Sequence, residues 1–216
     1  MVNVLGKENS VLNQFIAELR DVKVQNDPMR FRKNLERVGE IFAYEISKKL
    51  AYESKEVITP LGSAQVNVLN TYPVLATILR AGIPFHQGML NIFDKSENAF
   101  ISAYRKHHKD GTFQIEIEYI SKPTLDGRIL ILTDTMLATG YSMALAYREL
   151  IDDEKPAHTH IVAIIASLEG VNYMKRNFSS SELTIWVGAI DDELTAQAYI
   201  VPGLGDAGDL AYGSKI

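Results

Sequence analysis

The stretch from Ile129 to Ser142 constrains the fold of this chain more than any other. It opens with four consecutive aliphatic residues, Ile129 to Leu132, and a carboxylate, Asp134, follows shortly after them. A short apolar run of this kind is typical of a strand buried on both faces of a parallel sheet. A small, hydroxyl-bearing segment comes next, and residues 143–150 then have helical composition. The order of strand, acidic residue, glycine turn and helix predicts a phosphate site within an α/β fold.

The turn itself has the chemistry that such a site needs. Free backbone N–H groups at a helix start and the helix macrodipole both favour an anion. Thr139 and Ser142 add hydroxyl donors, and Asp134 is placed to accept sugar hydroxyls or to help hold a metal ion. The alternative is an ordinary strand-to-helix turn with a Ser or Thr N-cap. The Walker pattern is absent because no lysine follows the glycine, and the dinucleotide fingerprint lacks its further glycines.

Composition excludes several classes of protein. The chain has 216 residues, a net charge of -5 and no cysteine. Its acidic balance argues against general nucleic-acid binding, which needs a basic face. No apolar run approaches the roughly 18 residues that span a bilayer, and residues 1–10 lack the pattern of a signal peptide. We therefore expect a cytoplasmic protein without disulfides, thiolate zinc sites, a membrane partner or a nucleic-acid partner.

Hydrophobic periodicity predicts two helices near the N-terminus. Residues 11–20 have helical spacing, and Asp27-Pro28 has the form of an N-cap followed by proline at the first helical position. Apolar residues then recur every three or four positions to about Leu50. We expect this stripe to be buried, and it comprises Phe31, Leu35, Val38, Phe42 and Ile46.

Short apolar or alternating runs predict the strands. They cover residues 56–59, 74–79, 100–104, 113–119, 160–168 and 183–187, and a helix is expected from Pro84 towards Ile92. The runs at 100–104 and 113–119 are expected to pair as an antiparallel hairpin, with residues 106–111 as a flap. His158 and His160 share one strand face; strand-entry polar residues are the default reading, and a metal-ligand pair is the alternative. Trp186 is expected in the core.

The segment Asp134-Thr135-Met136-Leu137-Ala138-Thr139-Gly140-Tyr141-Ser142 resembles the 5-phosphoribosyl 1-diphosphate (PRPP) loop of the type I phosphoribosyltransferases. Its amino-acid sequence is most similar to that of the uracil phosphoribosyltransferase branch. Thr135 stands where that branch usually has proline, and Tyr141 where it usually has glycine. A bulky side chain at position 141 would crowd the phosphate cradle if its backbone φ were positive.

Other motifs extend the resemblance from about Leu19 to Ser214. The string Leu79-Arg80-Ala81-Gly82 resembles the family's pyrophosphate loop, and Tyr104-Arg105 resembles its second pyrophosphate contact. Residues 200–207 match the branch's base-binding hood letter for letter. Two tail positions differ, because Leu210 replaces a residue that is usually arginine and Ser214 replaces threonine.

The resemblance implies an α/β type I phosphoribosyltransferase fold, a parallel sheet flanked by helices with a β-hairpin flap and a C-terminal hood. It implies a single domain over residues 1–216, with an N-terminal helical segment at 1–52 and the hood tail at 199–216. The implied reaction is PRPP plus uracil giving UMP and pyrophosphate in pyrimidine salvage. Mg²⁺ would be bound mainly through PRPP, without a dedicated protein metal site, in a homodimer or higher homo-oligomer.

The resemblance also implies roles for particular residues. Arg105 and Asp206 are the expected catalytic residues, and Asp206 is a general-base candidate from its position alone. Ile200, Gly205, Asp206 and Ala207 are expected to read uracil, mainly through the backbone. The expected PRPP-binding residues are Arg80, Arg105, Asp134, Thr135, Met136, Leu137, Ala138, Thr139, Gly140, Tyr141, Ser142 and Asp206.

Three alternatives stay open from the residues alone. One is a regulatory protein of this fold that senses PRPP, nucleotides or RNA, although the acidic charge disfavours RNA. Another is a transferase for a different 6-oxo base, against which the intact hood argues. The third is a PRPP-binding pseudoenzyme, suggested by Thr135 and Tyr141.

Overall fold

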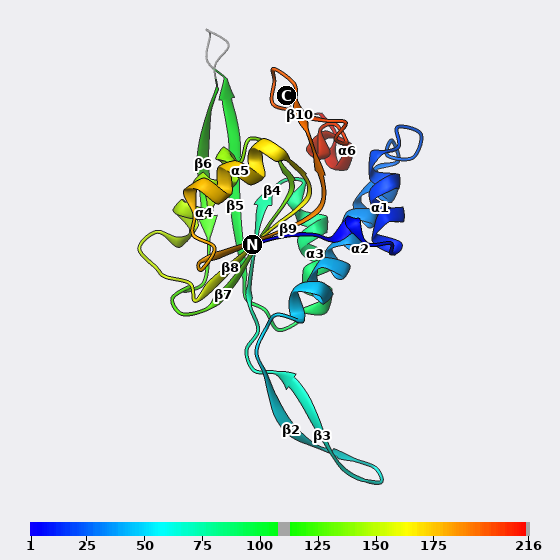
Figure 1. The fold of residues 1–216 in the computed structure, drawn as a ribbon, viewed down its shortest axis with the longest axis vertical. Helices are drawn as coiled ribbons and strands as arrows, with labels where there is room; N and C mark the ends of the chain where they lie inside the picture. Colours follow the sequence, from blue (N-terminus) through cyan, green and yellow to red (C-terminus); the bar gives the residue numbers. More distant parts are fainter. Residues whose placement is uncertain (108–112, 215–216) are drawn as a thin grey trace.

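A twisted seven-stranded sheet forms the centre of the molecule, with spatial order β1-β9-β8-β7-β4-β5-β6 (Figure 1). The computed structural model describes residues 1–107 and 113–214, and only the backbone at 104–107 and 113–116. All neighbouring strands in the sheet are parallel except the antiparallel pair β5–β6. The strands of this sheet are β1 (Val2–Val4), β4 (Val74–Leu79), β5 (Asn98–His107), β6 (Phe113–Ser121), β7 (Ile129–Leu137), β8 (His158–Ser167) and β9 (Leu183–Asp191).

Helices cover both faces of the sheet and give it two separate cores. Residues of α1 (Val11–Arg20), α2 (Pro28–Ser47) and α3 (Gly82–Ile92) pack against one face. Residues of α4 (Tyr141–Ile151) and α5 (Leu168–Asn177) pack against the other. Along β7, Ile131 enters the first core, whereas Leu130 and Leu132 enter the second. Burial on both faces explains why this strand is continuously apolar.

The two N-terminal helices are confirmed. Ser10 caps α1, and the Asp27 carboxylate caps α2 by accepting from the N–H groups of Met29 at 2.9 Å and Arg30 at 3.1 Å. Helix α2 ends at Ser47, so the predicted end near Leu50 was slightly late. The whole predicted stripe of α2 is buried, at 1% exposure or less: Phe31, Leu35, Val38, Phe42 and Ile46.

A projecting hairpin, which we call the arm, was only partly predicted. It consists of β2 (Tyr52–Thr59) and β3 (Gly62–Leu69), paired antiparallel around Pro60 and Leu61. The strand predicted at 56–59 is the end of β2, and β3 was missed. Nearly all arm residues are exposed, so they lack the one-sided burial that gives a strand its clear alternation. The arm extends away from the sheet at the end opposite the flap hairpin (Figure 1).

Several predicted boundaries were wrong. Residues 2–4 form β1 instead of belonging to a helical segment, because they pair with β9, and η1 (Leu5–Lys7) follows. Helix α3 begins at Gly82 and not at Pro84. The hood tail contains regular structure: β10 (Glu193–Leu194) pairs with β11 (Ile200–Val201), and α6 (Ala207–Tyr212) follows. Among the described residues, no helix has the length and apolarity needed to cross a bilayer.

Candidate active site

The predicted site residues gather at the carboxyl edge of three neighbouring strands, β7, β4 and β5. The register aligns Thr77 with Thr133 and Leu79 with Ser102. Asp134 directly follows Thr133, and Arg80 directly follows Leu79. Both residues therefore lie at the same edge of the sheet. The backbone of Arg105 continues along β5 and pairs with β6, as predicted for the flap hairpin; its side chain and residues 108–112 lie outside the described part of the structure. Ligands of open α/β sheets bind at this edge.

The phosphate loop is shorter than predicted. Strand β7 continues to Leu137 because Met136 and Leu137 still pair with Ile165 and Ala166 of β8. Of the nine residues from Asp134 to Ser142, the first four therefore belong to the strand and the last two to α4. The irregular part is residues 138–140, directly before the N-terminus of α4.

The left-handed backbone conformation occurs at Gly140 and not at Tyr141. Gly140 has φ +81° and is the N-cap of α4, whereas Tyr141 is the first helical residue. Its φ is not positive, since Asp152 and Ala198 are the non-glycine residues with positive φ in the described chain. The Tyr141 ring lies edge-on to Tyr173 of α5, with 6.5 Å between ring centroids. The condition under which Tyr141 would crowd the cradle is therefore not met.

Residues at the start of helix α5 pack against the phosphate loop and support it. Sequence reasoning missed this support. The Ser167 hydroxyl donates to the Ala138 carbonyl at 2.5 Å and accepts from the Gly170 N–H at 2.9 Å. A Cβ atom at Gly170 would collide with the carbonyl oxygens of Leu137 and Ala138. The available signal was Ser167 followed three residues later by Gly170, at the end of the strand predicted over residues 160–168.

Asp134 has an unusual environment for a carboxylate. It is partly buried, and Oδ1 accepts from the backbone N–H of Thr135 at 2.6 Å. Burial raises the pKa of Asp134 to about 7, against the opposing effect of hydrogen bonds from Thr135 and the Met136 backbone. A nearby cation or sugar hydroxyl groups would stabilise the charged form of this carboxyl group. The neighbouring Thr135 is 2% exposed, so its side chain belongs to the interior.

Arg80 connects the loop after β4 to the C-terminal tail. Its Nη2 atom lies 3.4 Å from Oδ1 of Asp209 and donates to the carbonyl of Gly213 at 3.2 Å. The Leu79–Arg80 peptide bond is cis. The tail that carries the hood therefore reaches the same edge of the sheet as the phosphate loop.

The hood presents its backbone because its apolar side chains point into the protein. Ile200, Leu204 and Ala207 are each 4% exposed or less and join the core of the α1–α3 face. Asp206 is the N-cap of α6 and accepts from the N–H of Asp209 at 3.0 Å. Leu210 packs partly buried against the same core. Gly205 is exposed and Asp206 is half-buried, whereas Ala207 is buried.

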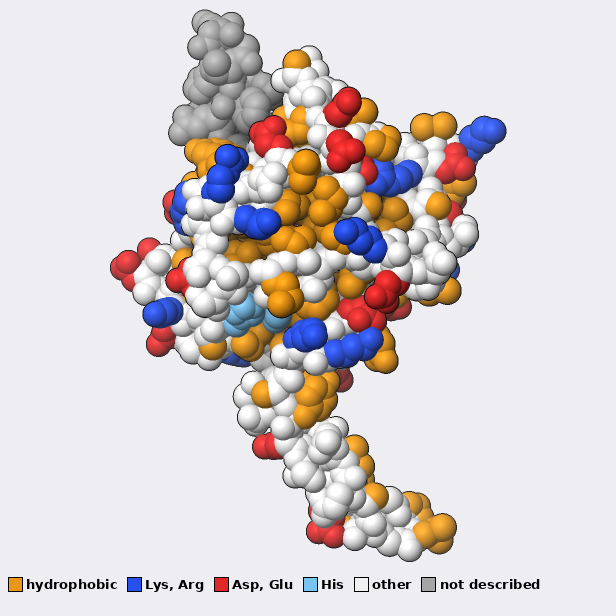
Figure 2. Space-filling model, in the orientation of Figure 1, with side chains coloured by type: hydrophobic (Ala, Val, Ile, Leu, Met, Phe, Trp, Pro, Cys, Tyr) orange, Lys and Arg blue, Asp and Glu red, His pale blue; other side chains and the backbone are white. Residues whose placement is uncertain are grey.

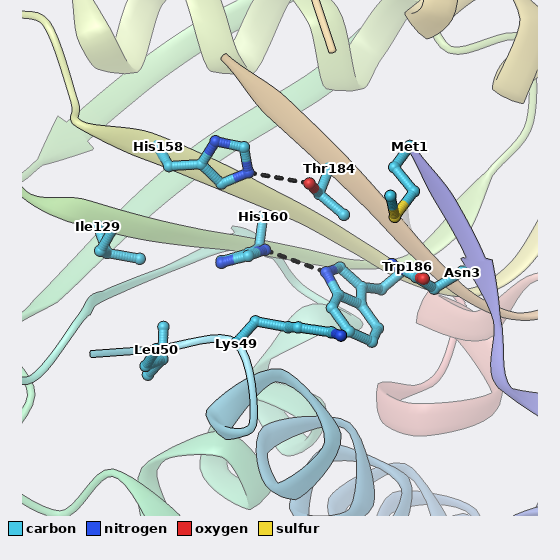
Figure 3. Close-up of a pocket in the computed structure, with 9 residues that line it drawn as sticks. All are labelled: Met1, Asn3, Lys49, Leu50, Ile129, His158, His160, Thr184 and Trp186. Carbon is cyan, nitrogen blue, oxygen red and sulfur yellow. Dashed lines mark hydrogen bonds between the residues drawn. The ribbon is translucent and has the colours of Figure 1, made fainter. Parts of the chain in front are cut away.

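The two histidines of β8 lie at the opposite, amino edge of the sheet. His160 Nδ1 accepts from the Trp186 indole N–H at 3.0 Å, and His158 Nε2 lies 2.9 Å from the Thr184 hydroxyl (Figure 3). They line a cavity of about 210 Å³ that Lys49 also borders. Trp186 is 3% exposed, which confirms its place in the core. In the described part of the chain no three His, Asp or Glu side chains are grouped to hold a metal ion.

Comparisons with known proteins agree with this geometry. A family model described as uracil phosphoribosyltransferase matches residues 6–214. A uracil phosphoribosyltransferase of Porphyromonas gingivalis is 55% identical over 212 residues, which cover 98% of each protein. The solved AQ2163 protein from Aquifex aeolicus has a TM-score of 0.86 and 32% identity over 100% of both chains. A hypoxanthine phosphoribosyltransferase from Staphylococcus aureus shares the fold, with a TM-score of 0.50 and 14% identity over 86% of this chain and 83% of its own. The chain therefore belongs to the uracil phosphoribosyltransferase family.

Proposed function

We propose that this chain transfers the 5-phosphoribosyl group of PRPP to uracil, giving UMP and pyrophosphate in pyrimidine salvage. One observation carries the proposal: the phosphate loop, Arg80 and the hood meet at the carboxyl edge of the sheet. An anion site, a guanidinium and a base-reading backbone are the elements that this reaction requires. Family membership over residues 6–214 supports the same assignment.

The reaction needs charge neutralisation and positioning. Departure of pyrophosphate leaves positive charge on the ribose ring, as in glycosyl transfer generally. Arg80 and Arg105 are assigned to the leaving diphosphate, because a guanidinium pairs well with phosphate oxygens. The N-terminus of α4 and the loop at 138–140 are assigned to the 5'-phosphate, and Asp134 to the ribose hydroxyls. These contacts convert binding energy into orientation of the anomeric carbon towards uracil N1.

The carboxylates at this edge suit a Mg²⁺ ion that is held mainly by the substrate. Asp134 and Asp206 offer hard oxygen ligands, but the described residues contain no three-residue metal cluster. When bound, Mg²⁺ would add to the neutralisation of the diphosphate charge. Asp134 would be the protein group to contact it, because burial raises the pKa of that carboxyl and a neighbouring cation would favour its charged form.

Base selection is assigned to the hood backbone. Uracil presents an acceptor, a donor and an acceptor along its edge, which backbone groups near Ile200 and at 205–207 can match. Cytosine places a donor where uracil has an acceptor, so it would leave hood groups unpaired and react poorly. Asp206 is assigned to PRPP and the base together, from the side of its carboxylate that does not cap α6.

A panel of bases assayed with PRPP and Mg²⁺ tests this function. Pyrophosphate release with uracil, and little with cytosine, hypoxanthine or guanine, is the expected result. Release with a different 6-oxo base would identify a sibling transferase. PRPP binding without release for any base would identify a regulatory protein or pseudoenzyme. A cytoplasmic location stays a prediction.

We also propose that the chain forms a homodimer or higher homo-oligomer, and the arm supports this. An isolated two-stranded hairpin is only marginally stable in water. This arm nevertheless exposes large apolar side chains (Figure 2), namely Val57 at 38%, Ile58 at 78%, Leu61 at 100% and Val66 at 44%. Light scattering of the Ile58→Asp/Leu61→Ser variant should show a shift towards monomer. An unchanged mass would remove the arm from the interface.

A further inference from the structure

An ion pair between Arg20 and Asp191 joins the hood to the body of the molecule. Arg20 is the last residue of α1 and Asp191 the last residue of β9. The pair is bidentate, with Nη1 to Oδ2 and Nη2 to Oδ1 both at 2.8 Å. Asp191 is 8% exposed and Arg20 23%. Two elements of the core thus meet at the point from which the hood departs.

The side chains of Arg20 and Asp191 also form hydrogen bonds with the backbone of one hood residue, Gly203. Arg20 Nη1 donates to the carbonyl of Gly203 at 2.9 Å, and Asp191 Oδ2 accepts from the N–H of Gly203 at 2.9 Å. The buried Gln25 adds a third contact, because its Nε2 donates to the Leu204 carbonyl at 3.1 Å and the Leu19 carbonyl at 2.7 Å. We call Arg20, Gln25 and Asp191 the hood clamp.

The charges of the clamp are maintained by its own contacts. Burial opposes ionisation of Asp191, but hydrogen bonds from Arg20 and Gly203 outweigh it and lower the pKa of that carboxyl. Charge-assisted hydrogen bonds are roughly twice as strong as neutral ones. Gly203 lies between Ile200 and Gly205, the two parts of the hood assigned to the base. A tether at this residue therefore limits how far those two parts can move relative to each other.

We propose that Arg20 and Asp191 are positioning residues that hold the hood backbone in the geometry that reads uracil and rejects cytosine. The inference rests on the function proposed above. A fixed spacing of backbone donors and acceptors lets them match three groups on the base edge at once, whereas a loosened turn adapts to a wrong base as well. The phosphate loop has its own support from α5, so PRPP binding should depend on the clamp only weakly, through the hood residue Asp206.

The Arg20→Ala variant gives the first test, with steady-state kinetics for both substrates. We expect the KM for uracil to rise about tenfold, because the charge-assisted hydrogen bonds of the Arg20 guanidinium are lost. The preference for uracil over cytosine in kcat/KM should fall, and the KM for PRPP should stay within about twofold. Arg30→Ala is the matched control, because Arg30 makes another bidentate pair, with Glu18 at 2.8 Å for both contacts, and within the described part of the chain it forms no hydrogen bond to the hood.

A charge swap separates positioning from stability. The double variant Arg20→Asp/Asp191→Arg can restore an ion pair, but an aspartate at position 20 cannot donate to the Gly203 carbonyl. The arginine at position 191 likewise cannot accept from the Gly203 N–H. We expect the swap to recover melting temperature lost in Arg20→Ala without recovering the KM for uracil. Recovery of both would show that the pair acts through stability alone and would overturn the inference.

The Arg20→Lys variant provides a further test of the hood clamp. Arg20→Lys keeps the charge but loses the fork that bridges three acceptors, so an intermediate KM for uracil is expected and provides data if Arg20→Ala does not fold. Equal effects of Arg20→Ala and Arg30→Ala on uracil would also overturn the inference. If the unaltered chain releases no pyrophosphate with uracil, the proposed function fails, whereas normal turnover with an unaffected Arg20→Ala variant refutes only the clamp.

Discussion

The phosphate loop and the hood form two sides of one candidate site, but they are held in different ways. The phosphate loop is ordered by close backbone packing: Gly140 in a left-handed conformation, Gly170 against two carbonyls, and the Ser167 hydroxyl on Ala138. The hood is ordered by side chains that reach it from distant parts of the sequence. Arg20 lies 183 positions from Gly203, and Gln25 lies 179 positions from Leu204.

This difference indicates where each side of the site is vulnerable. A loop defined by backbone packing is damaged by added volume, whereas a loop defined by charged contacts is damaged by lost charge. The supports share no residue, so damage to one side should affect the substrate of the other only weakly, through Asp206, which is assigned to both substrates. The following predictions test this separation, beginning with the variant that we expect to impair the enzyme most.

Asp134→Asn should affect the phosphate side most. Loss of the carboxylate removes charge-assisted contacts to the ribose or its cation, so kcat/KM for PRPP should fall about a hundredfold or more. Isothermal titration with PRPP and steady-state kinetics measure this effect. Glu169→Gln is a suitable control, since Glu169 is an exposed carboxylate in the first turn of α5. Comparable losses in the two variants would count against the role of Asp134.

The same variant should be more stable than the parent chain near neutral pH. The pKa of Asp134 is about 7 in the folded chain against 3.8 in the reference state, so the folded form keeps a proton that the unfolded form loses between these values. Stability therefore falls as pH rises from about 4 to about 7, by as much as about 3 kcal/mol. Thermal melts should show a gain for Asp134→Asn that is absent near pH 4 and largest above pH 7. A gain independent of pH would contradict this account.

Gly140→Ala should raise the KM for PRPP about tenfold and leave the KM for uracil nearly unchanged. The left-handed φ of +81° is unfavourable for alanine, and its Cβ would lie 2.9 Å from the Gly170 carbonyl and 3.1 Å from Tyr173. The loop must then shift relative to α4. Initial-rate measurements with each substrate varied in turn would reveal the split, and a parallel rise for uracil would break the proposed separation.

Gly203→Ala is the matching change on the hood, with a smaller expected effect of about fivefold on the KM for uracil. Its Cβ would collide with the Ile200 carbonyl, while the clamp still holds the Gly203 backbone from the other side. The KM for PRPP should not change. A variant impaired mainly towards PRPP would show that the two sides of the site are coupled.

Tyr141→Gly should have the smallest effect on catalysis, about twofold or less in the KM for PRPP. The ring packs on Tyr173 and the backbone at 141 is already helical, so its removal neither relieves nor disturbs the cradle. A stability loss of about 1 kcal/mol is expected from glycine in the first turn and the lost aromatic contact. A large fall in PRPP affinity would mean that the ring itself contacts the substrate.

Much of the architecture followed from local pattern. The apolar run at Ile129, the stripe of α2 and the cap at Asp27 each reflect a short-range rule, and each is confirmed. The extent of β7 was underestimated because pairing with β8 extended it through the polar residues Thr133 to Thr135. Strand β3 was missed because an exposed hairpin has no buried face to impose a pattern.

The motifs, their order and the family they belong to could be read from the amino-acid sequence, because phosphate and base recognition depend on glycine, hydroxyl and backbone geometry encoded within a few residues. The sequence also indicated which helices and strands form, because burial on one face leaves a periodic record. Three features became visible only in the folded chain: the left-handed turn at Gly140 instead of Tyr141, the support of the phosphate loop by Ser167, and the hydrogen bonds of Arg20 and Asp191 to Gly203. Such contacts join residues far apart in the chain, and no local pattern specifies which distant charge will meet a given backbone group.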